Sequence, residues 1–198
     1  MRTYGAIVLD VGHLPREGAV YDPDGAGPLP ELRETVLART YRDVAADVLR
    51  NEGFMVFGPL SGPHSERWAA TLLLASQHDG VLYVSCHVNA GKGNYGRVFY
   101  VRALNEELTL TTSIANTMAF LVHGGMRPAI AALGAWPRPY ACLAGFKGER
   151  SVAASLLEPG FIDNDKNANL WTEAGLVSLG RGLAAGIVRS GLARRVAS

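Results

Sequence analysis

The apolar residues of this chain follow two kinds of pattern. Short β-branched runs, beginning with "YGAIVLD" (4–10), are typical of buried strands, whereas residues 31–52 place apolar side chains at helical spacing. Pro30 and Gly53 stand where the start and the end of that helix favour them. The same patterns predict strands at 54–57, 80–90, 96–101, 140–146 and 151–158, and helices at 64–78, 109–122 and 172–190.

Strands that alternate with helices indicate a layered α/β fold with a largely parallel sheet. The chain has 198 residues and contains no internal repeat, low-complexity stretch or linker, which predicts a single domain over residues 1–198. Loops at 14–30 and 124–139 exceed the usual connection of about 4–6 residues. They are therefore candidate substrate-binding loops.

Composition excludes several classes of function. A net charge of +1 gives no excess of basic residues of the kind that binds nucleic acid. No apolar run approaches the roughly 20 residues that cross a bilayer, and the N-terminus lacks the features of a secretory signal. We therefore expect no membrane insertion and synthesis in the cytoplasm without a signal peptide. Cys86 and Cys142 form no C-x-x-C pair, and we expect both to be inert buried thiols.

Two of the five histidines share a context. His13 follows "IVLDVG" and His87 follows "VLYVSC", so each stands at or near the end of an apolar strand. Sites in open α/β sheets gather beyond the carboxyl ends of the strands. A single histidine in such a place is more often structural than a ligand, but the shared location favours convergence. We expect the other three histidines, at 64, 78 and 123, on solvated helix ends.

Two glutamates are further candidates. Glu34 heads the helix face that carries Leu37 and Tyr41, and a carboxylate on a core-facing side needs a partner such as a cation. A first-turn glutamate favoured by the helix dipole is the alternative, and Glu31 fits it equally well. Glu158 closes the apolar run "SVAASLLE", where it could act as a general base or be an exposed strand-end acid. These alternatives stay open at the level of pattern.

Two histidines and one glutamate make a typical catalytic zinc set that leaves a coordination position for water. Zinc lowers the pKa of such a water towards about 7 and polarises a carbonyl, and a nearby carboxylate can pass the proton to a departing amine. Other motifs are weaker. "GKGNYG" (91–96) lacks the P-loop spacing, and no G-x-S-x-G elbow is present.

Five blocks of the chain, in this order, resemble the zinc-dependent N-acetylmuramoyl-L-alanine amidases of the amidase_3 family. They are "IVLDVGH" (7–13), "ELRETVLARTYRDVAADVLRNEGFMV" (31–56), "SERWAATLLLA" (65–75), "VSCHVNA" (84–90) and "LLEPGFIDN" (156–164). The resemblance implies a three-layer α/β domain with a twisted, mostly parallel central sheet.

The resemblance also implies roles for individual residues. His13, Glu34 and His87 match the family's zinc ligands, and Glu158 matches its catalytic glutamate. The family's ligand glutamate stands 19 positions before the glycine that ends its helix, and here 53 − 34 = 19, which favours Glu34 over Glu31. The main departure is "GHLPREGA", which replaces the usual "GHGG" and recasts the loop after the first ligand.

The expected function is hydrolysis of the amide bond between N-acetylmuramic acid and L-alanine in peptidoglycan. With neither a signal peptide nor a separate wall-binding module, the sequence favours a phage endolysin or prophage lysin that a holin releases to the cell wall. We expect a monomer, although the sequence does not reveal the oligomeric state. Two alternatives remain: a zinc carboxypeptidase that acts on stem peptides, and a non-catalytic peptidoglycan-binding domain that keeps the fold.

Overall fold

The computed structural model describes residues 2–12, 34–101, 104–130 and 141–196. Three sequence predictions fall outside these ranges: the position of His13, that of Glu31, and the loop at 14–30. Most of the loop expected at 124–139 also lies outside them.

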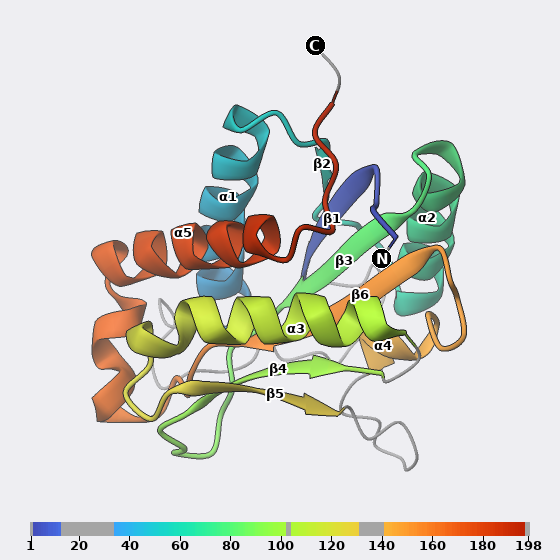
Figure 1. The fold of residues 1–198 in the computed structure, drawn as a ribbon. Helices are drawn as coiled ribbons and strands as arrows, with labels where there is room; N and C mark the ends of the chain where they lie inside the picture. The colour runs from blue at the N-terminus through green and yellow to red at the C-terminus, as the bar shows by residue number, and fades with distance from the viewer. Residues whose placement is uncertain (1, 13–33, 102–103, 131–140, 197–198) are drawn as a thin grey trace.

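A mixed, mostly parallel sheet of six strands forms the centre of the molecule (Figure 1). In spatial order its strands are β2 (Val56–Phe57), β1 (Ala6–Val11), β3 (Val81–Cys86), β6 (Val152–Glu158), β4 (Gly96–Tyr100) and β5 (Met126–Ile130). Every neighbouring pair is parallel except β4 and β6, which are antiparallel. The carboxyl ends of β1, β3 and β6 therefore share one edge of the sheet with the amino ends of β4 and β5.

Helices cover both faces of this sheet (Figure 1). One face carries α1 (Glu34–Asn51), α3 (Asn105–Met118) and α5 (Glu173–Arg189), and the other carries α2 (His64–Gln77) and the short α4 (Ala141–Ala144). Two short 3-10 helices complete the described elements, η2 (Ala119–Leu121) and η3 (Asp165–Trp171). The predicted three-layer α/β architecture is confirmed. Among the described helices, none combines the length and apolar character that crossing a bilayer requires.

The predicted helix faces are the ones that the fold buries. Leu37, Tyr41 and Leu49 of α1 are almost fully excluded from solvent. Glycines of α5 let that helix approach its neighbours closely, because a Cβ at Gly180 would collide with α1 and one at Gly186 would collide with α3. The small-residue pattern of the predicted helix at 172–190 therefore reflects tight packing between two other helices.

Two segments differ from the prediction. Residues 140–146, expected as a strand, contain α4, whose Cys142 carbonyl accepts a hydrogen bond from Trp68 Nε1 at 2.9 Å. A short apolar run cannot be assigned by periodicity alone, and here packing beneath α2 selected the helix. Residues 126–130, expected within a loop, form β5 instead. This strand lies at the edge of the sheet, where Pro128 is tolerated because one side of the strand needs no backbone donor.

Candidate active site at the carboxyl ends of the strands

A histidine and a glutamate that are 53 residues apart in the chain meet where the carboxyl ends of β1, β3 and β6 lie. His87 directly follows β3, and Glu34 opens the described part of α1. Glu34 Oε1 lies 3.0 Å from His87 Nδ1 and accepts a hydrogen bond from the backbone N–H of Val88 at 3.1 Å. The Glu34 residue is only 9% exposed, so the carboxylate is buried in this contact. The structure therefore brings together two of the predicted zinc ligands.

The His87 imidazole is held from its other side as well. Its Nε2 lies 3.1 Å from Ser85 Oγ, and the His87 carbonyl accepts a hydrogen bond from the Tyr41 hydroxyl at 2.9 Å. The backbone N–H of His87 donates to the Leu157 carbonyl at 2.9 Å, which ties the residue to β6. These contacts fix the ring with Nδ1 directed towards Glu34.

Gly12, the last described residue before the position of His13, lies against this ring. A Cβ at Gly12 would overlap three atoms of the His87 imidazole, so any side chain there would displace the ring. The Gly12 backbone N–H donates to the Cys86 carbonyl at 2.9 Å and continues the pairing of β1 with β3. Glycine at this position thus leaves room for the imidazole. The next residue in the chain is His13, the third predicted ligand.

Glu158, the predicted general base, ends β6 at the same edge. Asn89 Nδ2 donates to Glu158 Oε2 at 2.7 Å. Asn89 is itself fixed, because its N–H donates to the Gly160 carbonyl and its carbonyl accepts from the Ile162 N–H, each at 2.9 Å. Asn89 belongs to the block "VSCHVNA", but its residue type alone predicted no role. In the structure, Asn89 orients the Glu158 carboxylate.

Beneath the site, Asp10 is fully buried on β1 in a polar network that the sequence analysis missed. Its carboxylate accepts hydrogen bonds from the Tyr83 hydroxyl at 2.8 Å and the Leu60 N–H at 3.0 Å, and Arg67 Nη1 lies 3.4 Å away. Arg67 Nη1 also donates to the Val11 carbonyl at 3.0 Å. Burial, followed by the Asp10 charge, raises the pKa of Tyr83 well above its usual value, so the phenol remains a donor. This network anchors the end of β1 just before Gly12.

The donor set suits a metal such as zinc. Two ligands of a tetrahedral zinc, with bonds of about 2.0–2.2 Å, lie roughly 3.3–3.5 Å apart, close to the 3.0 Å between Glu34 Oε1 and His87 Nδ1. Over the described ranges, no group of three or more His, Cys, Asp or Glu residues that could hold a metal is found. The third predicted ligand, His13, lies outside those ranges. Zinc binding by His13, Glu34 and His87 therefore stays a prediction.

The predicted burial of both cysteines is confirmed. Cys86 and Cys142 are free and buried, and burial raises the pKa of each thiol to about 12. A thiol of that pKa is protonated at neutral pH, when it is a poor nucleophile.

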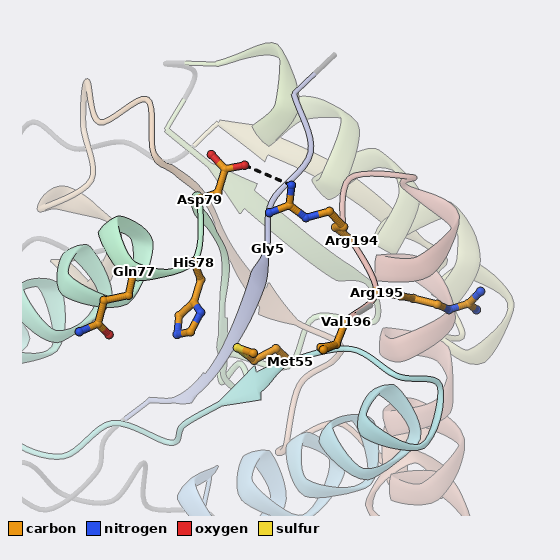
Figure 2. Close-up of a pocket in the computed structure, with 8 residues that line it drawn as sticks. All are labelled: Gly5, Met55, Gln77, His78, Asp79, Arg194, Arg195 and Val196. Carbon is orange, nitrogen blue, oxygen red and sulfur yellow. Dashed lines mark hydrogen bonds and ion pairs between the residues drawn. The ribbon is translucent and has the colours of Figure 1, made fainter. Parts of the chain in front are cut away.

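A separate polar pocket lies at the opposite edge of the sheet, beside Gly5, which precedes β1 (Figure 2). Figure 2 shows Asp79 turned towards Arg194, and their side chains are joined at 3.2 Å, whereas Arg195 points away. His78 lines this pocket and ends α2, as expected for a histidine at a helix end. Of the predicted site residues that the structure describes, Glu34, His87 and Glu158, none lines the pocket.

The family model for N-acetylmuramoyl-L-alanine amidase, Amidase_3, matches residues 7–189 of this chain. The chain belongs to this amidase family. The match runs from β1 to the end of α5 and includes all four predicted site residues. Comparison with curated protein sequences gives no match. Membership confirms the expected enzyme class, an amidase that acts on peptidoglycan.

Solved structures share the fold at low sequence identity. Cwp6 from Clostridium difficile is 21% identical with a TM-score of 0.72, over 94% of this chain and 29% of that chain. The catalytic domain of CwlV, an N-acetylmuramoyl-L-alanine amidase from Bacillus (Paenibacillus) polymyxa var. colistinus, is 19% identical with a TM-score of 0.68, over 96% and 97%. The amidase AmiC2 of Nostoc punctiforme is 17% identical with a TM-score of 0.68, over 94% and 98%.

Proposed function

We propose that this chain is a zinc-dependent N-acetylmuramoyl-L-alanine amidase that cleaves the bond between N-acetylmuramic acid and L-alanine. The observation that carries the proposal is the contact of Glu34 Oε1 with His87 Nδ1 at the sheet edge where Glu158 ends β6. The membership of the chain in the amidase family supports it.

In this proposal His13, Glu34 and His87 hold the metal. Bound Zn²⁺ would supply a nucleophilic water at neutral pH and polarise the carbonyl of the scissile amide. His87 would bind through Nδ1, and its protonated Nε2 would donate a hydrogen bond to Ser85 Oγ. Histidine ligands commonly have such an outer hydrogen-bond partner, which fixes the tautomer and the orientation of the ring.

Glu158 would perform the proton transfers. Its carboxylate accepts a proton from the attacking water and then donates it to the amine of L-alanine as that group leaves. Asn89 holds Oε2 at 2.7 Å, so the carboxylate is oriented before substrate arrives. A fixed orientation favours catalysis because the reacting groups need no further ordering.

The products of digestion test this proposal. The purified protein is incubated with peptidoglycan, with and without a chelator, and new amino termini are identified. We expect N-terminal L-alanine to appear, to disappear after chelation and to return when zinc is added. Release of a free terminal amino acid would instead identify a carboxypeptidase, and wall binding without new amino termini would identify a binding domain. Activity that survives complete metal removal would contradict the zinc requirement.

We further propose phage-driven lysis of a host cell as the biological setting. The catalytic domain of the CD27L endolysin, which targets Clostridia difficile, is 21% identical with a TM-score of 0.59 over 93% of this chain, which supports this setting at the level of the fold. An endolysin needs a holin to reach the wall from the cytoplasm. Expression inside a host cell should therefore cause lysis only when a holin is co-expressed, and lysis without a holin would contradict the proposed setting.

A further inference from the structure

Beside Glu158, two arginines continue the same row across the sheet. Arg97 on β4 is the register partner of Glu158 on β6, and Arg127 on β5 is the register partner of Arg97. Directly opposite residues of neighbouring strands project to the same face of a sheet. Because β4 is antiparallel to β6, its amino-terminal end brings Arg97 to the edge that carries the candidate active site.

Arg97 differs from the other described arginines that are withdrawn from solvent. Arg42 and Arg67 are buried, and their guanidinium groups lie 2.7 Å from Asp43 and 3.4 Å from Asp10. Arg97 is half-buried, yet it forms no ion pair with a carboxylate in the described part of the chain, Glu158 included. Its Nη1 donates to the Gly96 carbonyl at 3.2 Å, a neutral acceptor, whereas a partly desolvated cation is stabilised most by an anion.

Aromatic contacts hold the Arg97 guanidinium in place. Its Cζ lies 4.1 Å from the centroid of the Tyr95 ring, within the range of a cation–π interaction. The Tyr95 ring meets the Phe161 ring edge-on at 5.1 Å, and Phe161 is only 5% exposed. Because Phe161 follows Glu158 by three residues, the support for the cation and the proposed general base come from one continuous segment. Tyr95 is 36% exposed, so this group stands at the surface where substrate can reach it.

We propose that Arg97, with Arg127 beside it, binds the free α-carboxylate of the second residue of the stem peptide, and that this contact sets substrate preference. The proposal rests on the amidase function proposed above. The Cβ atoms of opposite residues such as Arg97 and Glu158 lie about 4.5–5.5 Å apart, and a peptide advances about 3.3–3.6 Å per residue. A group bound by Arg97 would therefore lie on the strand next to Glu158 and on the same face of the sheet, within the span of neighbouring residues of a peptide. A guanidinium matches a carboxylate with two parallel hydrogen bonds, which a point charge cannot do.

Two synthetic muramoyl tripeptides test this proposal. They are identical except that the α-carboxylate of the second residue is free in one and is an amide in the other. We expect the wild-type protein to have a KM about tenfold or more lower for the carboxylate substrate, the usual effect of a charge-assisted hydrogen bond. Arg97→Gln should raise the KM for that substrate to the value for the amide, with kcat changed less than about twofold. The KM for the amide substrate should not change.

Matched variants separate binding from general damage. Arg97→Lys keeps the charge without the planar fork, so it should retain part of the preference. Arg181→Gln makes the same charge change on an exposed position of α5 and should leave both KM values as in the wild type. Equal hydrolysis of the two substrates by the wild-type protein, or equal losses on both in Arg97→Gln, would overturn the proposal. If the wild-type protein releases no L-alanine amino termini from either substrate, the amidase proposal itself fails.

Discussion

Replacement of Glu158 by glutamine is expected to abolish hydrolysis of peptidoglycan while the fold and the proposed zinc binding are retained. Glutamine has nearly the same shape, and its amide oxygen can still accept the hydrogen bond that Asn89 Nδ2 donates to Glu158 Oε2 at 2.7 Å. It cannot accept a proton from water or donate one to the leaving amine. General acid–base groups contribute roughly 10²–10⁴-fold to rates, so turnover should fall by at least about a hundredfold.

This expectation requires two measurements on the same preparation, the rate of release of L-alanine amino termini and the zinc content. Glu149→Gln is the matched control, because it makes the same chemical change at an exposed residue before β6. The control should hydrolyse peptidoglycan at the wild-type rate. Normal turnover in Glu158→Gln would contradict the proposed mechanism, and loss of zinc would show that Glu158 is a ligand rather than a base.

Asp10→Ala is expected to lower the free energy of unfolding more than any exposed-charge substitution. Asp10 is fully buried, and its removal leaves Arg67, whose side chain is only 3% exposed, without its carboxylate partner. The Tyr83 hydroxyl and the Leu60 N–H also lose their acceptor. Breaking a buried ion pair by removal of one partner costs about 3–5 kcal/mol.

Urea unfolding of the wild type and of two variants checks this value. The matched control is Asp43→Ala, since Asp43 lies only 2.7 Å from Arg42 but its side chain is 52% exposed. Arg42 also keeps its hydrogen bonds to the Leu9 and Phe57 carbonyls. The control should lose less than about 1 kcal/mol, as is usual for solvated pairs. If the two variants lost the same free energy, burial would not be what makes the Asp10 network stabilising.

The order of the main elements could be predicted because the periodicity of apolar residues is a local property. Helices α1, α2 and α5 and strands β1, β3 and β6 form where their patterns indicate. The failures are short segments whose state depends on distant partners. The chain around Cys142 became helical beneath α2, and β5 exists because β4 offers it one edge to pair with.

The predicted site was only partly accessible to sequence reasoning. Strand ends indicated where His87 and Glu158 would lie, and the structure puts both at one edge of the sheet. Helix position could not separate Glu34 from Glu31, since both fit a first turn. The family spacing favoured Glu34, and in the structure the Glu34 carboxylate contacts His87. Glu31 lies outside the described residues.

The supporting polar residues were missed for a different reason. An aspartate within the apolar run "IVLDV" is a signal of a buried charge that needs a partner, but the sequence does not show which residue that partner is. Its partner Arg67 lies 57 residues further along the chain, and only the folded sheet brings the two together. The same holds for Asn89, whose contact with Glu158 spans 69 residues.

Because β4 runs antiparallel to β6, residues from strands of opposite direction meet at this edge of the sheet. The residues proposed for chemistry follow β1, β3 and β6, whereas Tyr95 and Arg97 arrive on a strand that runs the other way. Residues 91–95, which lead into β4, are in turn tied to the segment after β6, because the N–H groups of Gly91 and Lys92 donate to the Asp163 carboxylate. A substitution on β4 itself therefore changes the proposed substrate-binding side of this sheet end without replacing any residue of β1, β3 or β6.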